Sequence, residues 1–210
     1  MIPVNRQPEP ADFDRNVRQK GHKWLRKHGI AIDSPPPTPS DLPAYWRNCN
    51  QYLWDVYGGV CAYYAFYFQI VSGAASTDHF IAKSRHAGDA YEWNNYRLAC
   101  LGANQHKNKY DDILDPFELP PDTFFLALDT GQIYVNPVLE KQNKKLADLA
   151  AKTIKRLDLD SPNHRTMRHN HFVQYINLKN AQNTDNNAAK TYLKKQNPFV
   201  YSEAERQNLL

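Results

Sequence analysis

The sequence is poor in cysteine and has no long apolar stretch. Its three cysteines, Cys49, Cys61 and Cys100, cannot all pair within one chain, so we expect free thiols and not a disulfide framework. No run approaches the roughly 20 apolar residues of a membrane-spanning helix, and the first residues lack the apolar core of a signal peptide. We therefore expect a soluble, cytoplasmic protein with no membrane partner.

Two further patterns are missing. The sequence contains no GxxxxGK[ST] loop, so we do not expect this chain to hydrolyse nucleoside triphosphates itself, and it has no internal repeats. Its composition, with 41% hydrophobic and 23% charged residues, is typical of a globular protein and not of a disordered tail. The length of 210 residues suffices for one good-sized domain, or for a small core with substantial additions.

Positive charge gathers in the last third of the chain. Between Lys141 and Lys195 there are twelve Lys and Arg residues against four Asp and Glu residues, a local charge of +8, whereas the whole chain carries +4. Lysines on helices often form only a solvated face. The alternative is a surface that contacts nucleic-acid phosphates, and the motif described below favours this second interpretation.

Apolar periodicity and chain breakers divide the sequence into three predicted segments. Residues 1–58 are expected to hold helices and a Pro-rich connector, residues 59–115 a small mixed core, and residues 116–210 a hairpin, basic helices and a loosely ordered end. The expected elements are helices over about 11–28 and 41–57, strands over about 60–68, 77–80 and 96–99, a short helix over about 102–109, a hairpin over 124–135, and helices over about 139–157 and from 161.

The most informative stretch places an acid, a histidine and two amides in a fixed order. Asp78 and His79 are adjacent, Asn95 follows after a loop, and Asn104 comes next at the start of the expected short helix. A neutral imidazole, with a reference pKa of about 6.5, can take a proton from water near neutral pH. Carboxylate and amide oxygens suit hard divalent cations. These side chains therefore supply what phosphodiester cleavage needs: an activated water and a counter-charge for the phosphate.

The adjacency of Asp78 and His79 sets a structural condition. Successive side chains of a strand point to opposite faces of the sheet. The two residues can serve one site only if the strand is ending at this point. An irregular strand end is therefore a requirement of the hypothesis.

The segment from residue 61 to about residue 109 resembles the ββα-metal core of HNH (His-Me finger) nucleases of the Asp-His…Asn…Asn type. The resemblance implies an α+β fold in which this small core is embedded in a mainly helical domain, and it implies Mg²⁺ or Mn²⁺ as the cofactor. It also implies site roles: His79 as general base, Asp78 and Asn104 as metal ligands, Asn95 as the residue that ties the loop and helps to hold the base, and Lys107 facing the phosphate or the metal-bound waters.

The residues around the motif narrow the resemblance. The runs Asp-His-Phe-Ile-Ala-Lys-Ser at 78–84 and Trp-Asn-Asn-Tyr-Arg-Leu-Ala-Cys at 93–100 are most similar to HNH proteins of bacterial anti-phage systems of the Septu and retron-associated type. This implies an effector endonuclease, acting on DNA in preference to RNA, that works with an ABC/SMC-like ATPase partner. Two alternatives stay open: a nuclease that cuts RNA, and a non-catalytic subunit that binds nucleic acid or a partner.

The sequence departs from the pattern at the zinc positions. Many such proteins carry two Cys-x-x-Cys pairs that bind a structural zinc, but here Tyr64 follows Cys61, and Ala103 follows Cys100, where the second cysteines would stand. Two thiolates cannot fill a four-coordinate site. We therefore expect no structural zinc, with Tyr64 and neighbouring aromatic residues packing in its place.

Other residues near the motif are secondary candidates. Lys83 and Arg85 follow the expected catalytic strand closely enough to contact a substrate phosphate, with a solvated position as the alternative. His106 is a candidate auxiliary ligand, although an exposed position on a short helix is the preferred interpretation. Asn94 competes with Asn95 for the orienting role, and we prefer Asn95 because it gives the spacing to Asn104 that the family shows.

Overall fold

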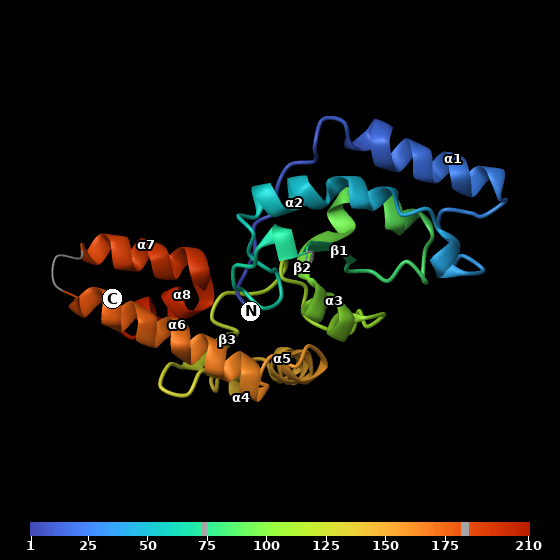
Figure 1. Cartoon of the computed structure of the whole chain (residues 1–210). Helices are drawn as coiled ribbons and strands as arrows, with labels where there is room; N and C mark the ends of the chain where they lie inside the picture. The colour runs from blue at the N-terminus through green and yellow to red at the C-terminus, as the bar shows by residue number, and fades with distance from the viewer. Residues whose placement is uncertain (73–74, 182–184) are drawn as a thin grey trace. The chain divides into compact units, whose positions relative to one another are not determined.

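The computed structural model of the chain describes residues 1–72, 75–181 and 185–210 (Figure 1). Its contacts form two compact units, and each unit combines helices with a two-stranded antiparallel sheet. The predicted α+β class is therefore confirmed. Within the described ranges, no helix is long and apolar enough to cross a membrane. The amino-terminal unit consists of Asn5–Gly59 and Phe68–Asp111, and the carboxy-terminal unit consists of Met1–Val4, Val60–Tyr67 and Asp112–Leu210.

The sheet of the amino-terminal unit pairs β1 (Ala75–His79) with β2 (Tyr96–Cys100), and every residue of β2 is buried. β2 runs directly into α3 (Leu101–Lys107), as Figure 1 shows. The order of strand, long loop, strand and helix is the one that the sequence predicts. Thr77 and Tyr96 are residue types that favour strands, and the helix begins where the pattern changes to helical spacing.

The helices of this unit are shorter than predicted. α1 (Gln19–Lys27) follows a π-helical turn, Asp14–Arg18, and α2 (Asn50–Val56) follows a 3₁₀ segment, Tyr45–Cys49, which we call η3. Gly58 has a φ of 59°, a left-handed conformation that glycine adopts without strain, so the chain can turn away directly after α2.

An aromatic cluster joins the first segment of the chain to β2. The ring of Phe13 lies 5.6 Å from the ring of Trp93 and 5.6 Å from that of Tyr96, both edge-on. Phe13 itself is 1% exposed. The predicted boundary near residue 58 therefore runs through one hydrophobic core, and residues 5–59 pack with residues 68–111 as a single unit.

The strand predicted over residues 60–68 was wrong. A single antiparallel bridge joins Val60 and Tyr67, and the residues between them form a compact turn. The N–H of Ala65 donates to Cys61 O (2.8 Å), and the N–H of Cys61 donates to Phe66 O (3.0 Å). Ala65 has a φ of 55°, so the chain folds back here although the composition is β-prone.

The carboxy-terminal unit contains the predicted hairpin and five helices within the described residues. β3 (Phe124–Ala127) pairs antiparallel with β4 (Gln132–Val135), and Gly131, with a φ of 69°, lies in the turn. The predicted helix over 139–157 is divided at Asn143, whose side chain accepts a hydrogen bond from Leu146 N. The helices are α4 (Leu139–Gln142), α5 (Lys144–Arg156), α6 (Pro162–Asn180), α7 (Asn186–Gln196) and α8 (Pro198–Arg206).

The prediction of a loosely ordered end was wrong, because α7 and α8 are capped helices with apolar contacts. The side chain of Asp185 caps α7, and the side chain of Asn197 caps α8. Leu193 of α7 and Phe199 of α8 are buried. The abundance of Asn, Gln and Lys concealed two amphipathic helices that pack side by side with α6 (Figure 1).

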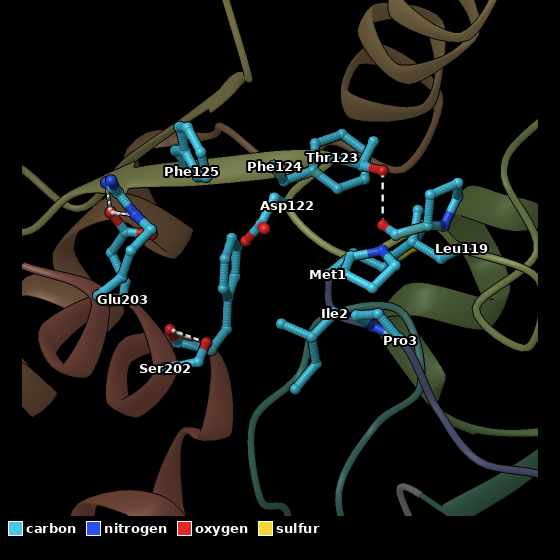
Figure 2. A pocket seen from close by; sticks show the side chains of 14 residues that line it. Met1, Ile2, Pro3, Leu119, Asp122, Thr123, Phe124, Phe125, Ser202 and Glu203 are labelled. Atoms are coloured by element: carbon cyan, nitrogen blue, oxygen red, sulfur yellow. Dashed lines mark hydrogen bonds and ion pairs between the residues drawn. The ribbon is translucent and has the colours of Figure 1, made fainter. Parts of the chain in front are cut away.

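A hollow of about 290 Å³ lies in the carboxy-terminal unit, and its lining includes the first residues of the chain, β3 and α8 (Figure 2). Its polar side chains bond to neighbouring protein groups. Ser202 Oγ donates to Phe199 O (3.0 Å), and Arg206 Nε donates to Glu203 Oε1 (3.1 Å). The ring of Phe125 lies 4.0 Å from the guanidinium of Arg206. Within the described lining of this hollow, the cationic side chain, that of Arg206, is therefore already paired with Glu203.

Candidate functional site

A second pocket, of about 440 Å³, lies in the amino-terminal unit. It is lined by the end of β1, the loop that follows β1, α3 with the residues just after it, and η3. The charged and polar side chains that line the pocket include Arg47, Asp78, His79, Lys83, Asn104 and Lys109.

β1 ends at His79, and both Asp78 and His79 line this pocket. The strand therefore ends at the motif, and both residues line one pocket although they pair in regular register with Arg97 and Tyr96 of β2. Both side chains are withdrawn from solvent, with exposures of 2% for Asp78 and 9% for His79.

The hydrogen bond of His79 identifies the ring nitrogen that can act as a base. Nε2 lies 3.0 Å from the backbone oxygen of Ala90. A carbonyl oxygen accepts only, so Nε2 carries the proton and Nδ1 keeps a lone pair. Burial lowers the pKa of His79 to about 3, so the ring is neutral near pH 7.

Two aromatic rings hold the imidazole in place. The ring of Trp46 meets the His79 ring edge-on at 4.8 Å and 89°, and the ring of Tyr96 does so at 5.2 Å and 83°. The hydroxyl of Tyr96 donates to the same Ala90 oxygen at 2.7 Å. Contacts from η3, from β2 and from the loop therefore fix the ring orientation.

Asn95 ties the loop between β1 and β2, as predicted. Its Oδ1 accepts from Ile81 N (2.7 Å), and its Nδ2 donates to Ile81 O (3.0 Å) and to Asp89 O (2.9 Å). Asp89 directly precedes Ala90, whose oxygen holds His79. Asn95 is therefore placed as a positioning residue that acts through the loop. Asn94, in contrast, is exposed, and the structure favours Asn95 for the orienting role.

The amide oxygen of Asn104 is oriented by a chain of hydrogen bonds. Ser76 Oγ donates to Ala99 O (3.1 Å), so the same hydroxyl can only accept from Asn104, whose Nδ2 lies 3.0 Å away. The amide nitrogen is thus committed to Ser76, and Oδ1 is the Asn104 atom left for a cation. Oδ1 and the Asp78 carboxylate are oxygen donors of the kind that Mg²⁺ and Mn²⁺ prefer.

The donor set fits a hard cation better than zinc. Among the described residues, no group of three or more His, Cys, Asp or Glu side chains is placed to hold a metal ion. A cation at Asp78 and Asn104 would therefore complete its coordination with water and substrate oxygens, as Mg²⁺ commonly does.

Lys107 lies in a different position from the one predicted. Its ammonium is 0% exposed and donates to His79 O (2.7 Å) and to Phe80 O (2.6 Å), with Asp78 Oδ2 4.0 Å away. Ala103 and Lys107, four residues apart on α3, are both buried on the face that packs on the sheet. Lys107 therefore braces the end of β1 from within and does not line the pocket.

The secondary candidates divide into one that lines the pocket and two that do not. Lys83 lines it, and its ammonium lies 4.5 Å from the centre of the Trp46 ring. Arg85 is 64% exposed in its side chain, and its Nε lies 2.7 Å from Asp111 Oδ2. His106 is exposed on α3. Neither Arg85 nor His106 is among the lining residues, so the structure places both outside the candidate site.

The lining residues that the sequence analysis did not single out include Trp46, Arg47 and Lys109. Trp46 lies in the segment 41–57 that was predicted to be a helix, where only its apolar character was apparent. Arg47 and Lys109 match no position of the motif. In the sequence, α2 and the loop after it separate Arg47 in η3 from His79 in β1. Only the packing of η3 beside β1 brings Trp46 and Arg47 to the site.

The basic region between Lys141 and Lys195 does not form one open cationic face. Lys152 lies 2.5 Å from Asp112, and Arg156 lies 3.8 Å from the same carboxylate. Arg168 is buried and donates to Gly131 O (2.7 Å). Arg165 is paired with Asp160. Several of the cations that suggested a phosphate-facing surface are thus engaged within the protein.

The three cysteines are free and buried, as predicted. Burial raises the pKa of the Cys49 thiol to about 12, so this thiol is not a nucleophile at neutral pH. Tyr64 is buried, and its ring lies 4.2 Å from that of His164 and 5.7 Å from that of Phe66. The absence of a structural zinc stays a prediction.

Comparison with known proteins adds no family to this picture. No protein-family model matches the chain, and no curated protein matches it. A functional assignment therefore depends on the geometry of the pocket and on the motif that supplies its residues.

Proposed function

We propose that this protein is a metal-dependent HNH endonuclease that hydrolyses phosphodiester bonds in nucleic acid, with DNA as the preferred substrate. The observation that carries the proposal is the arrangement of Asp78, His79 and Asn104 around one pocket, where β1 ends and α3 begins. In this arrangement, a neutral imidazole with a free lone pair stands beside two oxygen donors. Each of the three is the residue type that the ββα-metal core requires.

Different residues of this chain would carry out the separate parts of the reaction. A bound Mg²⁺ or Mn²⁺ would be held by Asp78 and Asn104 and would supply positive charge for the phosphate and the leaving oxygen. His79 accepts a proton from the attacking water at Nδ1 while that water forms a bond to phosphorus. The bond to the leaving oxygen breaks, and that oxygen is protonated by solvent water.

The environment of His79 prepares it for this step. When Nδ1 gains a proton, the Nε2–H bond to Ala90 O remains and stabilises the imidazolium. The edge-on contact with Trp46 keeps the ring from rotating between reaction steps. The negative charge of a bound phosphate favours the imidazolium and so opposes the effect of burial, which lowers the pKa of His79 in the free protein.

The free-energy cost of burying polar groups at this pocket favours a catalytic role over a purely binding one. Burying the carboxylate of Asp78 and the imidazole of His79 at one strand end is unfavourable unless each is compensated. A binding surface for phosphates needs cations and has no use for a neutral base beside Asp78. The non-catalytic subunit is therefore the weaker candidate.

The proposed biological role follows from the resemblance. We infer an effector subunit of a bacterial anti-phage defence system, working with an ABC/SMC-like ATPase that restrains or triggers cleavage. The preference for DNA over RNA has the same basis, since the pocket residues described here would contact phosphate and not the sugar and so do not themselves distinguish the two.

The test is a cleavage assay with the purified chain, alone and with its ATPase partner. Plasmid, single-stranded DNA and RNA are incubated with Mg²⁺, with Mn²⁺ or with EDTA. We expect cleavage only in the presence of a divalent cation. Full activity in EDTA, or no cleavage of any substrate with either metal and the partner present, would overturn the proposal.

A further inference from the structure

Positive charge lines the candidate pocket from three different parts of the amino-terminal unit. Arg47 comes from η3, Lys83 from the loop after β1, and Lys109 from the turn after α3. Against these three cations, the lining residues supply one carboxylate, that of Asp78. The pocket therefore carries a net charge of +2 before any metal ion binds.

We propose that Arg47, Lys83 and Lys109 form a binding subsite for the phosphates that flank the scissile one. The pocket would then select a chain of successive phosphates over an isolated phosphodiester. This inference rests on the proposed function for the position of the scissile phosphate at Asp78, His79 and Asn104. It assigns a substrate-binding role to two residues that the sequence motif does not contain, Arg47 and Lys109.

The pairing of the cations in this unit supports the subsite. Arg47 and Lys109 are both exposed, and neither side chain makes a hydrogen bond or an ion pair with any residue that the structure describes. Arg85, in contrast, is held at 2.7 Å by Asp111, and Arg18 is bound by several carboxylates, including Glu92 at 3.0 Å. Arg47 and Lys109 are thus available to an anionic ligand in the pocket, whereas Arg85 and Arg18 are engaged by carboxylates.

The third cation, Lys83, has its ammonium positioned at the wall of the pocket. Its ammonium lies over the Trp46 ring, the same ring that meets His79 edge-on. Its pKa is lowered, first by burial and second by the positive charge of Arg47. Arg47 and Lys83 therefore repel one another across the pocket, and a bound phosphate would relieve that repulsion.

Trp46 links this subsite to the base. One ring contacts both the ammonium of Lys83 and the imidazole of His79, so a phosphate seated on Lys83 lies on the same wall as the proposed nucleophilic water. Because the Trp46 side chain is 8% exposed, its role is to position these two groups and not to stack on a base of the substrate.

Binding in the absence of metal tests the subsite separately from catalysis. The full chain and the double variant Arg47→Gln/Lys109→Gln are titrated into a fluorescein-labelled single-stranded DNA oligonucleotide in EDTA, over a range of salt. Each phosphate contact to single-stranded DNA contributes about 0.7 to the slope of log K against log salt. We expect the double variant to bind more weakly, with a slope flatter by about 1.4.

Arg85→Gln is the matched control, because Arg85 lies close to Lys83 in sequence, is exposed, and is paired to Asp111 outside the pocket. It should bind the oligonucleotide with the wild-type slope. All three substitutions are at exposed positions, and circular dichroism verifies that the variants are folded. A double variant with the slope of Arg85→Gln overturns the subsite, as does a wild-type chain that does not bind the oligonucleotide at low salt.

A substrate with a single phosphate completes the test. With Mn²⁺, the double variant should lose more kcat/KM on the oligonucleotide, through a higher KM, than on bis(p-nitrophenyl) phosphate, which has no flanking phosphates. Equal losses on both substrates overturn the subsite. If the wild type binds the oligonucleotide with the expected slope difference but cuts neither substrate, the nuclease proposal fails and the phosphate subsite stands.

Discussion

Each of the two units contains a partly or fully buried histidine, and the comparison shows what makes one of them a candidate base. Burial lowers the pKa of both His79 and His171. Asn197 Oδ1 accepts from Val200 N (3.2 Å), so its Nδ2 must donate to His171 Nδ1 at 3.1 Å. The lone pair of that ring is used in capping α8. The bonded nitrogen of His79 donates instead, and the lone pair on its other nitrogen remains.

The same contrast holds for the two hollows. In the carboxy-terminal hollow of Figure 2, Arg206 is paired with Glu203. In the amino-terminal pocket, Arg47 and Lys109 have no acidic partner among the described residues. A lowered pKa or a hollow is therefore a poor guide to function by itself. The direction of hydrogen bonds and the balance of charge distinguish a site from a packing feature.

Replacing each histidine by alanine should give the largest difference in cleavage rate between a variant of one unit and a variant of the other. We expect His79→Ala to reduce the cleavage rate by about 10²–10⁴-fold, the usual contribution of a general base, while oligonucleotide binding is retained. His171→Ala should cleave at the wild-type rate and lose stability instead. Single-turnover cleavage and urea unfolding of both variants measure this. A His79→Ala variant with wild-type rates would show that another group acts as the base.

Removal of a proposed metal ligand should have the next largest effect. Asp78→Ala and Asn104→Ala should each raise the Mg²⁺ concentration needed for half-maximal activity by more than about tenfold, because loss of an outer partner of a metal site alone costs about 10–100-fold. Ser76→Ala, which leaves the Asn104 amide free to turn, should give a smaller increase. Metal titrations of cleavage compare the three. An unchanged Mg²⁺ requirement in Asp78→Ala would place the cation elsewhere.

Trp46 should act on rate through the position of the base. We expect Trp46→Ala to lower kcat by about tenfold with a smaller change in KM, and Trp46→Phe to restore most of the loss, since an edge-on ring contact with His79 can re-form. The effect should be smaller than the roughly 10²-fold cost of misplacing reacting groups by 1 Å. Equal activity of the Ala and Phe variants would contradict a positioning role.

The buried His79 should make the protein sensitive to acid. Its pKa is about 3 in the folded protein and about 6.5 in the unfolded chain, so the unfolded state binds more protons between these values. This contribution to stability is fully present above about pH 6.5 and is lost as the pH falls toward 3. Urea unfolding in EDTA should show a slope of up to about 1.4 kcal/mol per pH unit that His79→Gln lacks. Parallel pH curves for the two proteins would refute this.

Neutralising the basic face of α5 should have the smallest effect. Lys152 and Arg156 lie beside Asp112, so changing them with Lys155 to Gln removes charges that are largely engaged. We expect oligonucleotide binding close to wild type and a loss of stability of about 1 kcal/mol or less, as is usual for exposed ion pairs. A salt slope that flattens more than in Arg47→Gln/Lys109→Gln would show that the carboxy-terminal unit provides the main phosphate-binding surface.

The sequence predicted those features that depend on neighbours along the chain. β1, β2 and α3 follow from local β-propensity and from the change to helical spacing, and the β3–β4 hairpin follows from its glycine turn. The order of Asp78, His79 and Asn104 was equally visible. The adjacency of the first two residues set the condition that the strand end near them; the strand was predicted to run to Phe80, and it ends at His79.

Local patterns failed where burial outweighed composition. The polar end of the chain forms α7 and α8, because a few apolar residues and two side-chain caps suffice for helices that pack on one another. The aromatic run at 60–67 forms a turn, because tertiary contacts decide whether a β-prone segment finds a partner strand.

What the sequence by itself determined is the set of reactive groups and the small frame of two strands and a helix that carries them. The tertiary structure decided which other side chains join them. Packing of η3 beside β1 brings Trp46 and Arg47 to the pocket, and packing of α3 on the sheet buries the ammonium of Lys107 against backbone carbonyls. Spacing along a chain fixes only near neighbours. Contacts between distant segments depend on how whole elements bury their apolar faces, and that is settled only in the folded molecule.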